Sequence, residues 1–113
     1  MTEYSKNKKI LVVEDEEMIR DSLAEIVSSL FGFEVDVAAD GSIALEMIRK
    51  DTEKYGIVLT DLKMPNLDGM ELINQTKEIN QDIVFVVITG FATRDNAVSA
   101  LKRGAYDFVQ KPF

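Results

Sequence analysis

Short hydrophobic runs alternate along the chain with longer segments in which hydrophobic residues recur every three or four positions. The first kind of segment is typical of β-strands, and the second is typical of amphipathic helices that bury one side. Their strict alternation predicts right-handed strand–helix–strand crossovers and a parallel sheet with helices on both faces. The predicted strands are 10–13, 34–38, 57–60, 83–89 and 107–110, and the predicted helices are 16–31, a segment that starts at the turn 40–42, about 68–79 and about 94–103.

The pattern inside each run predicts the place of its strand in the sheet. The runs 10–13, 57–60 and 83–88 are hydrophobic at nearly every position, as in strands covered on both faces, so we expect them in the middle. The run 34–38 alternates between polar and hydrophobic residues, which is typical of an edge strand wetted on one side.

No helix is predicted after the fifth strand. The chain stops at Lys111-Pro112-Phe113, which leaves the sheet beside the first helix without a cover. We expect the chain to be a fragment of a longer polypeptide. The alternative is that a partner, an exchanged segment or a second copy in a dimer fills the bare hydrophobic face.

Composition narrows the function classes. With 113 residues, 46% of them hydrophobic, the chain fits one compact domain. The polar start MTEYSKNKK and the lack of a long hydrophobic run predict a cytoplasmic protein without a membrane segment. The absence of cysteine and histidine excludes thiolate chemistry, a histidine base and a phosphohistidine on this chain. A net charge of −7 is ordinary for solubility and argues against direct nucleic-acid binding through this segment.

Charged and hydroxyl residues follow four of the predicted strands. In open α/β sheets, ligands bind outside the carboxyl ends of the strands. A single acid at a strand end is usually a helix cap or a turn residue. Agreement at four strand ends is harder to explain in that way and indicates a binding site. The residues at these ends are Glu14-Asp15, Asp61, Thr89-Gly90 and Lys111-Pro112.

The charges of this set predict a metal ion. Two like charges about 5 Å apart at an effective dielectric constant of about 20 repel by roughly 3 kcal/mol. Three carboxylates would therefore hold protons tightly or recruit a cation, and Lys111 alone cannot balance them. Oxygen ligands without cysteine or histidine favour Mg²⁺, which usually binds one or two carboxylates and a phosphate oxygen. We therefore expect a site prepared for a phosphoryl group.

Four blocks in order resemble the receiver domain of two-component response regulators. They are ILVVEDEE, VLTDLKMPNLDGMEL, VVITGFA and GAYDFVQKPF, and the resemblance runs from Lys9 to Phe113. It implies a flavodoxin-like, doubly wound, five-stranded parallel sheet of order 2-1-3-4-5. It divides the chain into a polar N-terminal extension, 1–8, and a receiver domain, 9–113, that lacks its last helix.

The resemblance also implies the roles of the site residues. Asp61 is the phosphoacceptor, which receives a phosphoryl group from a phosphohistidine of a sensor histidine kinase or a histidine phosphotransfer protein. Asp15 binds Mg²⁺ directly, Glu14 binds it through water, and Asp61 and the backbone carbonyl of Lys63 complete the ligands. Glu14 stands where the family more commonly has aspartate. Lys111 contacts a phosphoryl oxygen.

A switch follows from the same resemblance. The hydroxyl of Thr89 moves to the phosphoryl group, and the space that it leaves admits the ring of Phe108. The alternative is that Phe108 is a fixed core residue. Lys63 and Phe91 flank the path of a hydrolytic water, and the peptide bond before Pro112 resembles one that the family holds cis. The domain is then a signalling switch that catalyses only its own phosphorylation and dephosphorylation, and an output domain follows Phe113.

Three other interpretations compete with this one. A phosphatase of the haloacid-dehalogenase type needs a second aspartate two residues after the nucleophile, where this chain has Lys63. A flavin-binding module of the flavodoxin type needs a phosphate loop after the first strand, where the acids of 14–17 would repel a phosphate. The third is a degenerate receiver that serves only as an interaction scaffold, which the retention of all five positions opposes.

Overall fold

The computed structural model describes residues 8–90 and 93–111, in which strands and helices alternate as predicted. Most element bounds lie within two residues of the predicted ones. Phe91 and Pro112 lie outside the described residues. The elements are β1 (Lys9–Val13), α2 (Glu17–Phe31), β2 (Val35–Ala38), α3 (Gly41–Lys50), β3 (Tyr55–Thr60), α4 (Gly69–Ile79), β4 (Val84–Thr89), α5 (Arg94–Lys102) and β5 (Ala105–Gln110).

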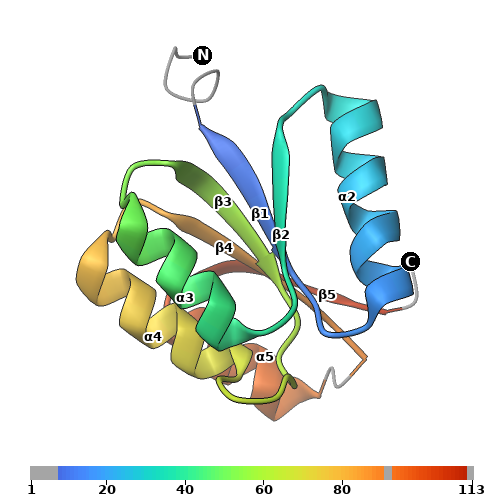
Figure 1. Ribbon diagram of the computed structural model, residues 1–113. Helices are drawn as coiled ribbons and strands as arrows, with labels where there is room; N and C mark the ends of the chain where they lie inside the picture. The colour runs from blue at the N-terminus through green and yellow to red at the C-terminus, as the bar shows by residue number, and fades with distance from the viewer. Residues whose placement is uncertain (1–7, 91–92, 112–113) are drawn as a thin grey trace.

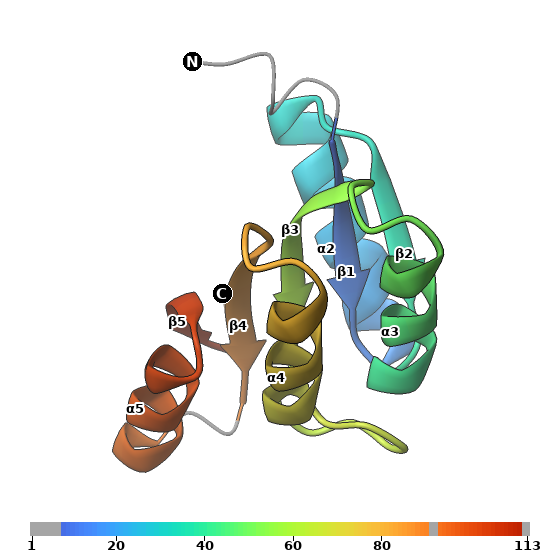
Figure 2. The ribbon, with the colours of Figure 1, turned by 90° about the vertical axis from the view of Figure 1, so that its left-hand side faces the viewer.

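The five strands form one parallel sheet of order β2-β1-β3-β4-β5. Helix α2 lies on one face of the sheet, and α3, α4 and α5 lie on the other (Figures 1 and 2). The chain moves outward from β1 to β2 and then crosses back to β3, so right-handed crossovers place the helices on opposite faces. The predicted doubly wound fold is confirmed.

The hydrophobic core lies between the sheet and the helices α3 and α4. Alternate residues of β1, β3 and β4 point into it, and α3 and α4 contribute the facing side chains. The predicted middle position of these three strands is confirmed. The most deeply buried members are Leu11, Ala44, Ile48, Val58, Leu72, Ile73, Phe85, Val87 and, from α5, Ala100.

The opposite face of the sheet is less completely covered. Leu23 and Val27 of α2 are buried, as are Ile10 and Val12 of β1. Farther along the sheet the pattern changes, because alternate residues of β4 are only half-buried. That a further segment or a partner covers this part of the sheet stays a prediction. None of the helices in the described part of the chain has the length and hydrophobicity that a membrane crossing requires.

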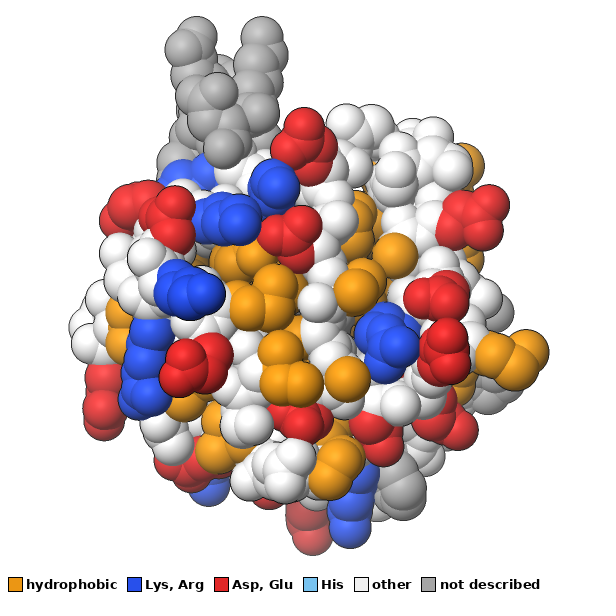
Figure 3. All heavy atoms as spheres, in the orientation of Figure 1, with side chains coloured by type: hydrophobic (Ala, Val, Ile, Leu, Met, Phe, Trp, Pro, Cys, Tyr) orange, Lys and Arg blue, Asp and Glu red, His pale blue; other side chains and the backbone are white. Residues whose placement is uncertain are grey.

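Strand β2 is an edge strand, as its alternation predicted, but its polar side is not simply wetted. The Asp36 carboxylate accepts a hydrogen bond of 2.6 Å from the Tyr55 hydroxyl and lies 3.5 Å from the Lys54 ammonium. Val37, in contrast, is 42% exposed. Figure 3, in the orientation of Figure 1, shows hydrophobic side chains at the surface between groups of charged side chains.

The contact between Asp36 and Tyr55 shifts the pKa of both groups. The hydrogen bond from Tyr55 is the main cause that lowers the pKa of Asp36; burial opposes it, and Lys9 and Lys54 add to the lowering. Burial and the neighbouring carboxylate raise the pKa of Tyr55. A carboxyl whose pKa is lowered on folding stabilises the fold above its ordinary pKa, and this contribution is lost as the pH falls through the folded-state value.

We predict that Tyr55→Phe lowers the free energy of unfolding by about 1 to 2 kcal/mol at neutral pH, because a buried hydroxyl bonded to a charged group is removed. The difference from the wild type should shrink as the pH falls below the ordinary aspartate pKa of about 3.9 and through the lower pKa of Asp36 in the folded protein. Urea unfolding at a series of pH values measures both effects. Tyr106→Phe is the control, because Tyr106 is 77% exposed. A difference that stays constant or grows toward acid pH would contradict the prediction.

Candidate functional site

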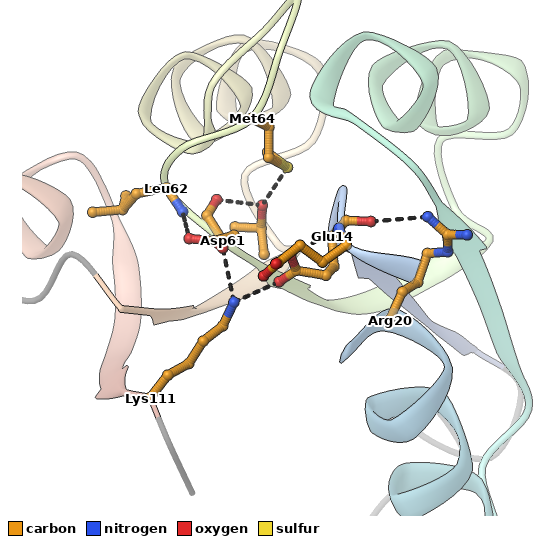
Figure 4. A network of polar contacts seen from close by, with 8 residues as sticks. Glu14, Arg20, Asp61, Leu62, Met64 and Lys111 are labelled. Atoms are coloured by element: carbon orange, nitrogen blue, oxygen red, sulfur yellow. Dashed lines mark hydrogen bonds and ion pairs between the residues drawn. The ribbon is translucent and has the colours of Figure 1, made fainter. Parts of the chain in front are cut away.

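Three charged side chains from separate strand ends meet at the carboxyl edge of the sheet. Lys111 Nζ lies 2.8 Å from Glu14 Oε1 and 2.9 Å from Asp61 Oδ2 (Figure 4). These partners are 97 and 50 residues away along the chain, and the parallel strands β1, β3 and β5 bring them together. The structure thus brings together residues that follow separate strands in the sequence and that were predicted to share one site.

A fourth residue, Asp15, joins the two carboxylates. Glu14, Asp15 and Asp61 each offer a carboxylate oxygen, and these oxygens lie within 4.8 Å of one another. Glu14 and Asp61 are buried, with 1% and 5% exposure, whereas Asp15 is exposed to solvent. A set of hard oxygen donors with a net negative charge fits Mg²⁺.

Backbone hydrogen bonds fix the two buried acids. The Glu14 amide donates to the Ala38 carbonyl, and the Asp61 amide donates to the Val13 carbonyl, so both acids continue the sheet pairing by one residue. Their side chains also accept backbone bonds. The Leu62 amide donates to Asp61 Oδ1 at 2.6 Å, and the Glu16 amide donates to Glu14 Oε2 at 3.1 Å.

The cluster changes the pKa of two of its members. Burial is the largest cause that raises the pKa of Glu14, and the Asp61 charge adds to it, while hydrogen bonds from Lys111 and the Glu16 amide oppose the rise. Burial lowers the pKa of Lys111, but its bonds to Glu14 and Asp61 outweigh burial and raise it overall. Lys111 therefore stays charged at neutral pH, and the acids still attract further positive charge.

Thr89 and Phe108 lie on neighbouring strands beside this cluster. Thr89 is fully buried at the end of β4, and its carbonyl accepts a bond of 2.9 Å from the Lys111 amide. Val87 pairs with Phe108 in the β4–β5 register, so the Phe108 ring is on the same face as Val87 and Thr89. Phe108 is half-buried against the core. The structure brings the two predicted switch residues onto one side of the sheet.

Lys63 lies in the loop 62–68, two residues after Asp61, and is exposed.

Two contacts around the site were not predicted from the sequence. Arg20, in the first turns of α2, donates from Nη1 to the Glu14 carbonyl at 3.2 Å (Figure 4). The Thr60 hydroxyl donates to the Asp61 carbonyl at 2.9 Å. In the sequence, Arg20 looks like any exposed helix arginine and Thr60 like any strand threonine, so neither contact could be predicted.

Gly69 lets helix α4 begin close to the site. It is the first residue of α4, and the Asp68 side chain caps this helix by accepting a hydrogen bond from the Glu71 amide. A Cβ at position 69 would overlap the backbone carbonyl of Asp61. Glycine therefore lets the start of α4 pack directly on the backbone of the central acid.

The family model for the response regulator receiver domain matches residues 10–113. The transcriptional regulatory protein FixJ of Rhizobium meliloti is 35% identical over 113 residues, which are 100% of this chain and 52% of FixJ. The receiver domain of NtrX from Brucella abortus is a structural neighbour with 39% identity and a TM-score of 0.84, covering 93% of this chain and 87% of that one. The CheX-CheY-BeF3-Mg²⁺ complex from Borrelia burgdorferi gives 27% identity and a TM-score of 0.89, covering 94% and 79%.

The chain spans about half or less of the length of the curated relatives that it matches. Two of the structural neighbours match 94% of this chain with TM-scores of 0.85 and 0.89, and the predicted fold and resemblance are confirmed.

We predict that Gly69→Ala lowers the free energy of unfolding by about 3 kcal/mol, because the added methyl group meets a backbone carbonyl that cannot move away. Gly90→Ala is the matched control, since a Cβ at Gly90 would meet nothing within 4 Å and should change stability by less than about 0.5 kcal/mol. Urea unfolding of both variants measures the difference. Equal stability of the two variants would show that α4 does not need this close approach.

Proposed function

The chain belongs to the response regulator receiver domain family, and we propose on that premise that it is a phosphorylation switch whose phosphoacceptor is Asp61. The observation that carries the proposal is the grouping of Glu14, Asp15 and Asp61 around the ammonium group of Lys111. The family match gives the class of protein, and this grouping supports phosphorylation of Asp61 in this particular chain.

Asp61 supplies the nucleophile. A carboxylate is already a nucleophile, so no base is needed to activate it. A carboxylate oxygen attacks the phosphorus of a phosphohistidine on a partner protein. The new O–P bond forms as the N–P bond breaks, and the electron pair of that bond returns to the imidazole of the donor. Since these 113 residues contain no histidine, the phosphohistidine lies outside them, and we assign it to a sensor histidine kinase or a histidine phosphotransfer protein.

Charge neutralisation and orientation provide the catalysis. When bound, Mg²⁺ neutralises charge that develops on the phosphoryl oxygens. Asp15, Asp61 and the Lys63 carbonyl would hold it directly, and Glu14 would hold it through water. Lys111 already lies 2.9 Å from the acceptor carboxylate, within reach of a phosphoryl oxygen placed there, and binds it as a point charge.

The switch uses the change of charge at Asp61. Phosphorylation replaces one carboxylate charge with about −2 beside a buried threonine. The Thr89 hydroxyl turns to the phosphoryl group, and Phe108, which lies on the same face of the sheet, moves inward into the space that is left. Phe108 has no hydroxyl, so packing alone holds its inward position. This shift biases the loops after β3 and β4 and helix α5 between two conformations.

We place this switch in the cytoplasm as one part of a longer regulator. FixJ is named a transcriptional regulatory protein, and this chain spans 52% of it. The proposal therefore includes an output domain that the phosphorylated receiver controls. The phosphatase alternative lacks its acid, since an exposed Lys63 occupies the required position. The scaffold alternative leaves the grouping of three carboxylates within 4.8 Å unexplained.

We predict that incubation with Mg²⁺ and acetyl phosphate adds one phosphoryl mass to the intact protein. Mass spectrometry of the whole chain measures the gain. Asp61→Asn should abolish it, whereas Asp68→Asn, which alters an acid of the same loop but keeps a good helix cap, should not. A gain in mass that survives in Asp61→Asn would remove Asp61 as the acceptor, and steady hydrolysis of many phosphomonoesters would favour a phosphatase.

We also predict that Mg²⁺ stabilises the folded protein. A ligand at ten times its dissociation constant adds about 1.4 kcal/mol to the free energy of unfolding. The thermal midpoint should therefore rise as Mg²⁺ is titrated, and Asp15→Asn should reduce the rise. Asp21→Asn, on the exposed side of α2, is the control and should respond like the wild type. Identical Mg²⁺ responses of the Asp15 and Asp21 variants would place the metal elsewhere.

A further inference from the structure

The loop 62–68 connects Asp61 to α4 and contains Lys63, whose carbonyl is a proposed metal ligand. The base of this loop is closed by backbone contacts. The Gly69 amide donates to the Leu62 carbonyl at 2.8 Å, and the Leu62 amide donates to the Asp61 side chain. These contacts fix where the loop starts and ends. They leave open how its middle, with the Lys63 carbonyl, is oriented.

The tip of the loop has an uncommon backbone conformation. Asn66 has a φ of 72°, and within the described part of the chain it is the one residue other than glycine with a positive φ. The Leu67 amide donates to the Pro65 carbonyl at 2.8 Å, so Asn66 is the central residue of a three-residue turn. Asparagine adopts a positive φ more readily than most residues that carry a side chain, and a hydrogen bond from its side chain can hold it there.

Asp40 provides such a contact. Asn66 Nδ2 donates to Asp40 Oδ2 at 2.8 Å, across 26 residues of sequence. The other oxygen, Asp40 Oδ1, accepts from the Ile43 amide at 2.9 Å and the Ser42 hydroxyl at 3.1 Å, because Asp40 is the N-cap of α3. Asp40 is only 7% exposed, so the acceptor of the Asn66 bond is fixed by a helix and shielded from water.

Two further observations support a rigid anchor. Burial raises the pKa of Asp40, but its hydrogen bonds outweigh burial and lower the pKa overall, so the carboxylate remains an acceptor. Next to it, a Cβ at Gly41 would overlap the Leu67 carbonyl. The loop tip therefore rests on the first residue of α3, backbone against backbone, and Asn66 fastens it there.

We propose that the hydrogen bond from Asn66 to Asp40 is a positioning contact that sets the metal affinity of the site by holding the loop 62–68 with the Lys63 carbonyl toward Asp61. The inference rests on the proposed function. Without the bond, the loop samples other conformations, and the apparent dissociation constant rises by the inverse of the fraction that remains competent to bind. Loss of a contact that orients a metal ligand typically weakens metal binding by about tenfold or more.

The test compares metal binding in variants that keep the fold. Asn66→Gly retains a residue suited to positive φ and removes only the side-chain donor. Asn66→Asp places a carboxylate against that of Asp40. The pair Asp40→Asn with Asn66→Asp reverses donor and acceptor, keeps the net charge and restores the bond. Mn²⁺ serves as the probe, and the electron paramagnetic resonance signal of free Mn²⁺ reports binding without any turnover.

We expect Asn66→Gly to raise the Mn²⁺ dissociation constant about tenfold, Asn66→Asp to raise it further, and the swapped pair to return it toward the wild-type value. The rate of phosphorylation by acetyl phosphate should fall at low Mg²⁺ and recover at saturating Mg²⁺. The matched control is Asn80→Ala, which removes a side-chain bond of 2.7 Å to the Thr52 carbonyl at the other end of α4. It should lower the thermal midpoint and leave Mn²⁺ binding unchanged.

The outcomes separate this inference from the proposed function. If the wild type binds Mn²⁺, Asp61→Asn weakens that binding, and Asn66→Gly binds like the wild type, the positioning contact is refuted and the phosphoacceptor site stands. A swapped pair that binds as weakly as Asn66→Asp refutes it too. If the wild type binds no Mn²⁺ at all, both the positioning contact and the proposed function are refuted.

Discussion

The burial of two carboxylates around one ammonium group is the constraint on which the site depends. Glu14 and Asp61 are almost fully shielded from water, and Lys111 bonds to both. A buried ion pair seldom stabilises a fold more than well-packed hydrophobic residues would, and a second buried acid makes the balance worse. Burial raises the pKa of Glu14, as expected for a carboxylate that is removed from water. Stability therefore does not explain the cluster, which instead supports the proposed binding of Mg²⁺ and a phosphoryl group.

The parallel sheet makes such a cluster possible at low conformational cost. Strands that run in the same direction end at the same edge, so the acids after β1 and β3 and the lysine after β5 converge without long loops. The sheet pairing continues into the site, since the Asp61 amide bonds to the Val13 carbonyl and the Lys111 amide bonds to the Thr89 carbonyl. Reactive groups on strand ends are held more precisely than groups on free loops. The same pairing couples Lys111 to the predicted switch residue Thr89.

The loop after β3 is held in another way, because no strand supports it. Gly69 closes its base against the Asp61 backbone, and the bond from Asn66 to Asp40 fastens its tip to α3. Helix α3 follows the edge strand, so the contact ties the periphery of the sheet to its centre. The hydrophobic face beside α2 shows the opposite situation, with half-buried side chains on β4. The loop that carries the proposed site is thus held by more contacts than the half-buried face of β4.

The sequence by itself determined the alternation of strands and helices, the central and edge strands, and the acids and lysine at the strand ends. These features depend on local periodicity and on the direction in which each strand runs, both of which can be read from neighbouring residues. Only the tertiary structure decided the bond of Tyr55 to Asp36, the bond of Asn66 to Asp40, and the close approach that requires Gly69. All three depend on strand register or loop shape, which leave no trace in local pattern. The two hydrogen bonds, for example, join residues that are 19 and 26 positions apart.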